Sequence, residues 1–456
     1  MLYFTRLSIA FLTAYFLGRI IYLYFSTSKE KNSIISKFHS FFLGLGLTSI
    51  SFWLYTIAVN GYNSNYHIVE VCFVAVIYLR LWLKKRNKTT NLSIIRSSEN
   101  TSSCQKKRSL INYLITILLG LIAVLCAVRC LIYPDGSWDA LAMWNFRARF
   151  LALGNEEWSL MYLDTFDYSH RDYPLFLPCI IARCFNYTGG TDTIIPLFFS
   201  WFFTFISFIL VYLYLIKLKN KYYSVLAVCL LSYSPQYIFY GSMQYADIPL
   251  ALFILISIYE FILWERENKD LPWLCMLFAG LCFWVKNEGI PWFIGFSLII
   301  IYCLYKKDNN FVSSIKKFLK TVVALLPVII SFLFVRYFAN SENDMVLGWG
   351  ERIIQLFLPE RYVMIMPYVI NFTKQHFWML FIPIYLLLGF VDKRYYKYYY
   401  LFKLILVMYM IYVFIYLITP HDLSWHLRTS FLRIFAVYLP SIMFLGCLLF
   451  DLKRKK

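Results

Sequence analysis

The sequence predicts an all-α integral membrane protein, a polytopic bundle of about 12–13 transmembrane helices. Of its 456 residues, 60% are hydrophobic and only 15% are charged, whereas a water-soluble chain of this length needs far more polar surface. Apolar runs long enough to cross a bilayer as helices recur along the chain, at 3–25, 38–60, 111–133, 192–216, 399–418 and 431–450. Many Tyr and Trp stand near the ends of these runs, where aromatic rings anchor helices at the membrane interface.

The net charge of +19 reports membrane topology and does not indicate a nucleic-acid partner. Lys and Arg cluster at 84–109 and at the C-terminal 453–456, as is typical of cytoplasmic segments. Counting outward from these two anchors predicts that loops 134–191, 339–375 and 420–430 lie on the non-cytoplasmic side. The polar residues that could form an active or binding site are therefore predicted to gather on the non-cytoplasmic side.

Three regions are predicted. Residues 1–110 form an N-terminal three-helix membrane region that ends in the basic loop, 111–340 form a membrane module, and 341–456 form a C-terminal membrane region. In the first outer loop, 138–153 has the pattern of an amphipathic helix lying on the membrane surface. The apolar stretch 272–305 is too long for one span, so we expect a hairpin with the charged turn 286–289 outside. The alternative is one long, kinked helix that buries Lys286 and Glu288 as a pair.

Several polar motifs fall on the predicted outer side of the membrane. They are Gly136-Ser-Trp-Asp-Ala140 with Trp144, His170-Arg-Asp-Tyr-Pro174, Tyr245-Ala-Asp-Ile-Pro249, Trp284-Val-Lys-Asn-Glu-Gly289, and Thr419-Pro-His-Asp422 followed by Trp425, His426 and Arg433. In this order they resemble bacterial GT-C glycosyltransferases, relatives of the protein O-mannosyltransferases and of the aminoarabinose transferase acting on lipid A. The resemblance runs from about 111 to 445, so the first three helices look like an addition to a GT-C-like catalytic module.

The resemblance implies a sugar transferase of the inner (plasma) membrane whose active site faces the periplasm or exterior. Its donor would be a polyprenyl-phosphate-linked sugar, and its acceptor a cell-envelope glycan such as lipopolysaccharide, a lipid or a protein. In this family an acidic residue of the first outer loop is the base, and by position that residue is Asp139. The loop lacks an adjacent Asp-Glu pair, so Asp135 stays open as the alternative. A base without a second, nucleophilic carboxylate fits inversion at the anomeric carbon.

Two of the candidate carboxylates also have a plain structural interpretation. Asp139 stands at the start of the predicted surface helix, where Asp commonly caps free backbone N–H groups. Asp247 precedes Ile248-Pro249 and an apolar run, the pattern of a helix N-cap, or else it faces the sugar or a metal. Lys286 and Glu288 either form a salt-bridged hairpin tip or contact the donor, with Lys286 on its phosphate.

The remaining candidates are cationic or polar side chains of the outer loops. Arg428 and Arg433 would clamp a phosphate or extend toward the interface, and Arg433 is favoured because it stands inside an apolar run. The spacing of Asp422 and His426 permits metal ligation, but a hydrogen-bonded interfacial His is the more common arrangement. A divalent cation therefore stays open. Three further side chains are candidates for orienting a substrate: His170, Asp172 and His421.

Two other functions would also suit a polytopic protein. A transporter or lipid flippase would show internal repeats and polar residues along a central path, and neither is evident in the sequence. A polysaccharide ligase or polymerase would use Arg and His residues of a large outer loop, which makes 339–375 central instead of 134–191. The clustering of outer carboxylates in 134–191 favours the transferase.

Overall fold

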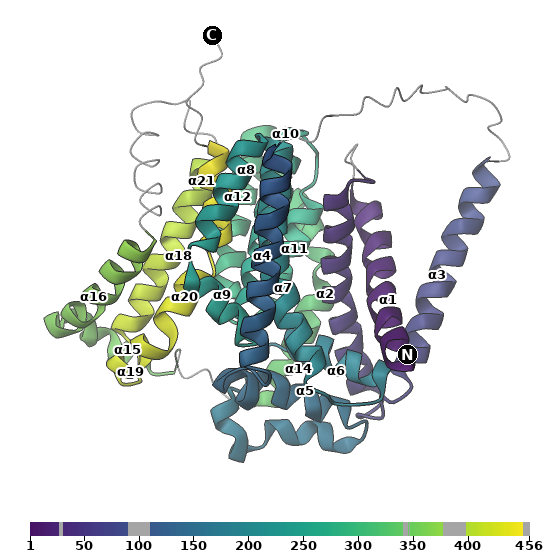
Figure 1. Ribbon diagram of the computed structural model, residues 1–456, viewed down its shortest axis with the longest axis horizontal. Coiled ribbons are helices and arrows are strands. Elements are labelled where there is room, and N and C mark those ends of the chain that lie inside the picture. Colours follow the sequence, from purple (N-terminus) through teal and green to yellow (C-terminus); the bar gives the residue numbers. More distant parts are fainter. Residues whose placement is uncertain (27–30, 90–109, 341–344, 346, 377–397, 450–456) are drawn as a thin grey trace, which may run out of the picture.

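The computed structural model describes residues 1–26, 31–89, 110–340, 345, 347–376 and 398–449. Throughout these ranges the chain is helical and contains no strand, which confirms the all-α membrane class (Figure 1). Eight of the described helices are long and apolar enough to cross a membrane, or up to ten spans if each of two bent pairs counts as one. Most of the basic loop 84–109 and the C-terminal lysines, on which the inside–outside assignment depends, fall outside the described residues.

The long helices form the body of the bundle. They are α1 (Leu2–Phe25), α2 (Ile34–Ala58), α3 (Tyr66–Thr89), α4 (Leu110–Ile132), α7 (Ile194–Leu218), α10 (Asp247–Arg266), α12 (Gly289–Asp308) and α18 (Tyr399–Leu417). All of these except α3 are candidate membrane spans, and the eighth candidate is the C-terminal stretch Leu423–Leu449. Shorter helices pack among them: α8 (Lys221–Ser232), α9 (Pro235–Ser242), α11 (Trp273–Val285) and α21 (Leu439–Leu449). The two bent pairs are α13 (Phe311–Val323) with α14 (Leu326–Ala339), at 64°, and α15 (Trp349–Arg352) plus η4 (Ile353–Phe357) with α16 (Pro359–Gln375), at 83°.

Short helices gather at one end of the bundle, the lower end in Figure 1, where the N-terminus also lies. The predicted outer loop 134–191 supplies η1 (Ala140–Trp144), α5 (Asn145–Ala152), η2 (Glu156–Tyr162), η3 (Asp164–Ser169) and α6 (Phe176–Thr188). The C-terminal region adds α19 (Leu423–His426), η7 (Leu427–Phe431) and α20 (Leu432–Ala436). This end of the molecule therefore combines the polar motifs that lie far apart in the sequence.

The first two helices pack closely because small residues face each other. Ala10, Ala14 and Gly18 repeat at four-residue spacing along α1, and a Cβ added to Gly18 would lie 1.9 Å from the carbonyl oxygen of Ser40. A Cβ added to Gly44 of α2 would lie 1.8 Å from the carbonyl oxygen of Ala14. Such small-residue faces let membrane helices approach until their backbones touch.

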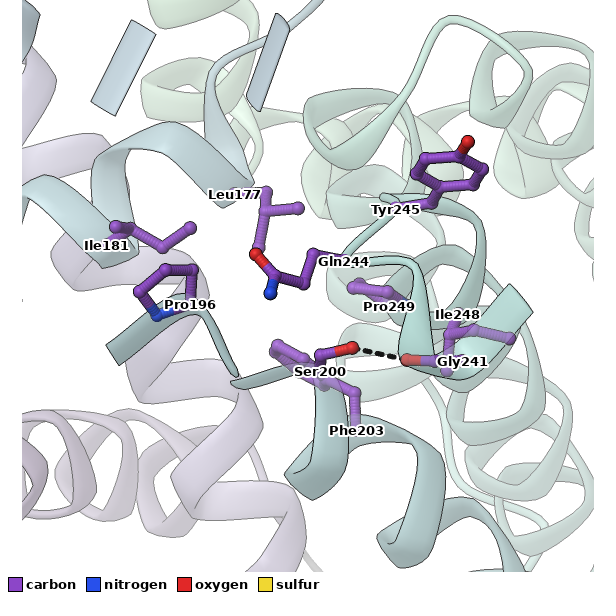
Figure 2. A pocket seen from close by; sticks show the side chains of 10 residues that line it. All are labelled: Leu177, Ile181, Pro196, Ser200, Phe203, Gly241, Gln244, Tyr245, Ile248 and Pro249. Carbon is purple, nitrogen blue, oxygen red and sulfur yellow. Dashed lines mark hydrogen bonds between the residues drawn. The ribbon is translucent and has the colours of Figure 1, made fainter. Parts of the chain in front are cut away.

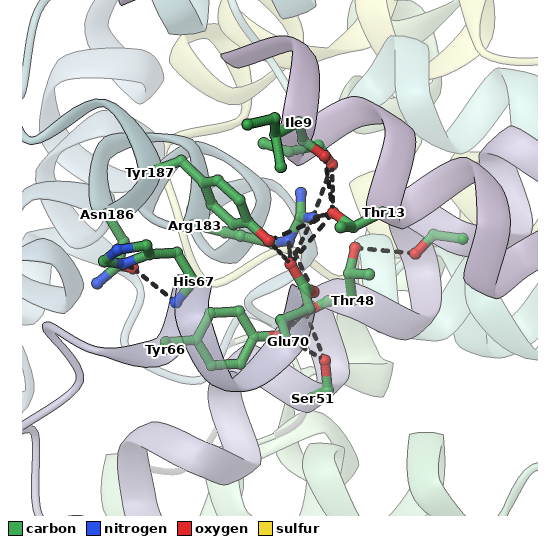
Figure 3. Close-up of polar contacts among 12 residues, drawn as sticks. Ile9, Thr13, Thr48, Ser51, Tyr66, His67, Glu70, Arg183, Asn186 and Tyr187 are labelled. Atoms are coloured by element: carbon green, nitrogen blue, oxygen red, sulfur yellow. Dashed lines mark hydrogen bonds and ion pairs between the residues drawn. The ribbon is translucent and has the colours of Figure 1, made fainter. Parts of the chain in front are cut away.

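Two buried polar networks attach the N-terminal helices to the rest of the bundle. In the first, Arg183 of α6 pairs with Glu70 of α3 at 2.6 Å, and Glu70 also accepts from the hydroxyls of Tyr66 (2.8 Å) and Tyr187 (2.5 Å) (Figure 3). In the second, His39 of α2 lies 2.5 Å from Glu260 of α10. The predicted N-terminal region 1–110 is thus bonded to the predicted module 111–340, and the boundary at 110 stays a prediction.

Replacing Glu70 with Ala is expected to destabilise the protein by about 3–5 kcal/mol. The substitution leaves the guanidinium of Arg183 buried without its counter-ion, which is costly at membrane depth. Unfolding of the purified protein in mixed micelles measures the effect. The matched control is Asp164→Ala, which removes an exposed partner of Arg171 and should change stability by about 0–1 kcal/mol. Equal effects of the two substitutions would contradict the assignment of Glu70 as a structural anchor.

The charged turn at 286–289 confirms the predicted hairpin. Helix α11 ends at Val285 and α12 begins at Gly289, so one long helix is the wrong interpretation of this stretch. Lys286 and Glu288 nevertheless pair, at 2.8 Å, as that alternative had proposed for them. The turn is largely buried and is held by these charges.

The prediction of one surface helix over 138–153 needs correction. The chain is helical from 138 to 152 as predicted, with the π-helical turn η1 running directly into α5, but Arg147 is completely buried. Its guanidinium donates to the backbone carbonyls of Ser169 (2.7 Å), Tyr173 (3.0 Å) and His170. Arg147 therefore stabilises the turn of the outer loop from within, and the amphipathic pattern marks packing of α5 on the bundle.

Candidate functional site

Five predicted site residues converge at the end of the bundle where the short helices gather. Arg433 of α20 contacts Asp139 at 2.5 Å between Nη1 and Oδ2, and Lys286 contacts Asp247 (2.9 Å) and Glu288 (2.8 Å). The side chains of Lys286 and Asp247 are only 2% and 3% exposed, whereas those of Asp139 and Arg433 are 18% and 16% exposed. We call these residues the charged cluster. It has a deeply buried half and a half that solvent or a ligand can reach.

Asp139 and Arg433, the partners of the more exposed ion pair, each lie beside a π-helical turn. η1 begins directly after Asp139, and η7 ends at Phe431, shortly before Arg433. A π turn inserts an extra residue into a helix, re-aims the side chains beside it and is frequent at functional sites. Asp139 and Arg433 are 294 positions apart in the sequence, so only the tertiary fold brings them together.

The capping interpretations of Asp139 and Asp247 are wrong. Neither side chain accepts a capping hydrogen bond from its helix, because the carboxylate of Asp139 turns to Arg433 and that of Asp247 to Lys286. Buried carboxylates are stable as anions when a cation and hydrogen bonds meet them. Each of the two carboxylates therefore serves as the anionic partner of a cation and not as a helix cap.

The turn between α9 and α10 binds the segment that presents Asp139. Gln244, which has a left-handed backbone (φ 58°), donates to the carbonyl of Pro134 (2.8 Å) and accepts from the side chain of Asn145 (2.6 Å). Gly136 also has positive φ (78°), and a Cβ there would lie 2.7 Å from the carbonyl oxygen of Met243. Glycine is thus required for this close approach. Sequence reasoning did not identify Gln244.

Behind the turn of the hairpin lies a second polar group. Asp172 accepts from the side chain of Asn287 (2.8 Å) and pairs with Arg336 of α14 (3.1 Å), which also reaches the side-chain oxygen of Asn287 (3.4 Å). These bonds fix the turn 286–288 against the outer loop. The prediction missed Arg336, although an Arg inside the apolar run 326–339 carries the signal that singled out Arg433.

Two tyrosines of the sequence motifs border the charged cluster. The ring of Tyr245 lies beneath the guanidinium of Arg433, 5.0 Å from its carbon, in a cation–π contact. The hydroxyl of Tyr173 donates to Glu288 at 3.5 Å. Burial, then the nearby carboxylates of Glu288 and Asp172, raise the pKa of Tyr173 well above its ordinary value, so it stays a neutral hydroxyl.

Two polar atoms of the charged cluster are buried without a hydrogen-bond partner in the described residues: Nε of Arg433 and Oε2 of Glu288. One is a charged donor and the other a charged acceptor, and orphaned groups of this kind are costly unless a ligand or water meets them. The arrangement offers a donor to an anion such as a phosphate and an acceptor to a hydroxyl.

The other predicted candidates have local roles. Asp422 caps α19 by accepting from the backbone N–H of Trp425 (2.7 Å), and His426 is bonded to the hydroxyl of Thr419 (2.8 Å). Asp422 and His426 are thus each engaged in a local contact. Arg428 is exposed.

The remaining candidates are exposed or make local contacts. The backbone carbonyl of His170 accepts from Arg147, while the residue His170 is exposed. Asp135 is an exposed residue before Gly136, and the rings of His421 and Trp425 lie 5.4 Å apart.

A small cavity of about 10 Å³ lies next to Tyr245, between α6, α7 and the turn before α10 (Figure 2). Its walls are mostly apolar, with Leu177 and Ile181 from α6, and the hydroxyl of Ser200 is turned to the carbonyl of Gly241. That volume holds about one water molecule. The cavity is therefore too small for a sugar.

Within the described ranges, no group of three or more His, Cys, Asp or Glu side chains is placed to hold a metal ion. The carboxylates of the charged cluster are each engaged by a cation of the chain. The cations of the charged cluster are Lys286, which is buried between two carboxylates, and the partly exposed Arg433.

Comparison with known proteins adds an independent observation. Residues 172–334 match the sequence model of the dolichyl-phosphate-mannose-protein mannosyltransferase family. The match covers just over a third of the chain and includes Asp172, Asp247, Lys286 and Glu288, whereas Asp139 and Arg433 lie outside it. Neither the curated proteins nor the solved structures gave a match. This part of the chain is similar to that family, and together with the all-helical membrane fold the match supports a membrane glycosyltransferase of the GT-C type, related to the protein O-mannosyltransferases.

Proposed function

We propose that the protein transfers a sugar from a polyprenyl-phosphate-linked donor to an acceptor hydroxyl on the non-cytoplasmic side of the inner (plasma) membrane. The observation that carries this proposal is the contact of Asp139 with Arg433 beside the Lys286–Asp247–Glu288 group. Asp139 of the predicted outer loop contacts the cation Arg433, and Arg433 in turn lies close to Asp247, the partner of Lys286. A base beside cationic groups is what glycosyl transfer from a phosphate needs.

In the proposed reaction, the acceptor oxygen attacks the anomeric carbon as the bond from that carbon to the phosphate oxygen breaks. Asp139 takes the proton of the acceptor hydroxyl. The polyprenyl phosphate leaves with the bonding electrons, and Arg433 and Lys286 stabilise its negative charge. A single displacement of this kind inverts the anomeric centre.

The unpartnered atoms suggest how the donor would be oriented. Arg433 keeps its Nε–H for a phosphate oxygen even while its Nη1 holds Asp139. Glu288 keeps Oε2 for a hydroxyl of the sugar. Asp172 with Asn287 and Arg336, and Gln244 on the other side, act on the site by positioning the turn and the loop that present these groups. The donor's isoprenoid chain would remain in the bilayer.

The two alternative functions receive less support from the described residues. The charged cluster joins residues of the 134–191 loop, the 286–289 turn, α10 and α20 at one place. The two other buried ion pairs of the described residues, His39–Glu260 and Glu70–Arg183, belong to separate networks instead of forming with the cluster the continuous polar path that a transporter requires. In the region that a ligase would use, Arg361 donates to the backbone carbonyl of Tyr416 (3.1 Å), and Arg352 to those of Met345 (3.0 Å) and Leu347 (2.8 Å). These arginines serve the local fold.

The test is transfer by the purified full-length protein in lipid nanodiscs, supplied with polyprenyl-phosphate sugars and envelope-derived acceptors. We expect a glycosylated acceptor and free polyprenyl phosphate in equal amounts, with the configuration at the anomeric carbon inverted by NMR. Retention of configuration would contradict the single-displacement mechanism. Movement of intact donor between leaflets without any transfer would replace the proposal with a flippase.

A further inference from the structure

Helix α2 of the N-terminal region contacts the two helices that hold the polar turn of the charged cluster. In Figure 1 it lies beside α11 and α14, and it is in contact with both. α2 stands outside the family match, which covers 172–334, and before the residues that carry the GT-C resemblance. Its buried side chains nevertheless form hydrogen bonds with the segments next to the hairpin turn.

The contact closest in sequence to the charged cluster joins Ser49 to Trp284. The indole Nε1–H of Trp284 donates to the hydroxyl of Ser49 at 2.8 Å, and both residues are completely buried. That hydroxyl in turn donates to the backbone carbonyl of Gly46 at 2.6 Å, so its lone pairs are left to accept from the indole. α11 ends at Val285, and Lys286 follows directly. The bond to Ser49 therefore anchors the end of the helix from which Lys286 extends.

A second contact of α2 reaches the other support of the turn. Trp53 donates from its Nε1–H to the backbone carbonyl of Ser331 at 3.2 Å. Ser331 lies in α14, the helix whose Arg336 bonds to Asn287. Ser49 and Trp53 are four residues apart, so they share one face of α2. This face fastens both helices that hold the hairpin turn.

We propose that Ser49 is a positioning residue of the charged cluster, acting on Lys286 through Trp284. The ammonium of Lys286 contacts Asp247 at 2.9 Å and Glu288 at 2.8 Å, and a small rotation at the end of α11 lengthens both contacts. Removing the Ser49 hydroxyl leaves a buried indole N–H without its acceptor, a cost that movement of the helix end relieves. The consequence for catalysis rests on the proposed function, in which Lys286 stabilises the leaving phosphate.

The kinetic test compares Ser49→Ala with Ser51→Ala in the full-length protein in nanodiscs. Ser51 is on the same helix, but its hydroxyl bonds to that of Tyr66 (2.6 Å), within the N-terminal region. We expect Ser49→Ala to lower kcat about tenfold, because misplacing a group that acts in the transition state costs rate. The KM for the donor should change less than about twofold. Ser51→Ala should leave both constants within about twofold of wild type.

Trp284→Phe breaks the same hydrogen bond from its other partner. It should lower kcat as Ser49→Ala does, and adding Ser49→Ala to it should lower kcat no further, because the two residues act through one bond. Independent, multiplied effects of the two substitutions would contradict a role of Ser49 through Trp284. If Ser49→Ala does not fold, Trp284→Phe carries the same test.

Hydrogen exchange reads the same contact without any sugar transfer. The amide N–H groups of Gly289 and Ile290 donate to the carbonyls of Lys286 (2.8 Å) and Asn287 (2.9 Å). Ser49→Ala should speed the exchange of these turn amides about tenfold over wild type, and Ser51→Ala should not.

Two results would overturn the proposal. One is equal exchange at the turn in Ser49→Ala, Ser51→Ala and wild type. The other is a fall in kcat of Ser49→Ala that only follows the fraction of folded protein. A wild type that transfers no sugar would remove the proposed function, whereas the exchange of the turn amides would still decide whether Ser49 holds the turn.

Discussion

Replacing Asp139 with Asn is expected to lower the rate of sugar transfer by about 10²–10⁴-fold. The amide has nearly the shape of the carboxylate but cannot take a proton from the acceptor hydroxyl. It also loses the charge that meets Arg433 at 2.5 Å. The measurement is the initial rate of transfer by the purified protein, with expression and melting temperature followed in parallel.

Two control variants test whether the loss of activity is specific to Asp139. Asp135→Asn changes an exposed carboxylate four positions earlier in the same loop, and Asp422→Asn changes an exposed helix cap. Both variants should retain wild-type activity within a few-fold. Full activity of Asp139→Asn would contradict our assignment of the base, and loss of activity in Asp135→Asn instead would move the base to that residue.

Replacing Arg433 with Gln is expected to lower kcat/KM by about 10²–10³-fold, the usual cost of removing one preorganised group that stabilises charge in a transition state. Gln can still donate a hydrogen bond, but it cannot neutralise the leaving phosphate. Arg433→Lys keeps the charge and should recover part of the activity, because an ammonium lacks the planar donor pair of the guanidinium. Steady-state kinetics with varied donor concentration measure both variants.

The matched control for this prediction is Arg428→Gln. Arg428 is in η7, shortly before Arg433, but is exposed. Its removal should leave kcat/KM within a few-fold of wild type. If the two substitutions had the same effect, the role of Arg433 would be one of general positive charge at this end of the bundle.

The membrane fold could be predicted from the sequence because it depends on local composition. Runs such as 111–133 and 192–216 are apolar over a full bilayer thickness, and no tertiary contact is needed to recognise them. The hairpin at 286–289 was the expected interpretation, since charges in the middle of a 34-residue apolar stretch divide it, but the sequence alone left one long, kinked helix open.

The details of the charged cluster could not be predicted in this way. A carboxylate at a helix start has the same sequence pattern whether it caps its helix or binds a distant cation. The pairing of Asp139 with Arg433 crosses 294 positions, and that of Asp247 with Lys286 crosses 39. The surface helix predicted over 138–153 did not foresee the burial of Arg147, because the carbonyl partners of Arg147 lie in irregular turns that have no sequence signal.

The most direct test of our account is the equilibrium binding of a polyprenyl-phosphonate sugar, a donor analogue that cannot react, to three proteins in nanodiscs. If Arg433 holds the phosphate and Asp139 acts only as the base, Asp139→Asn should bind the analogue at least as tightly as wild type while being inactive. Arg433→Gln should bind it at least tenfold more weakly. Equal affinity of the analogue for wild type and Arg433→Gln, or loss of binding in Asp139→Asn, would contradict the proposed roles in the charged cluster.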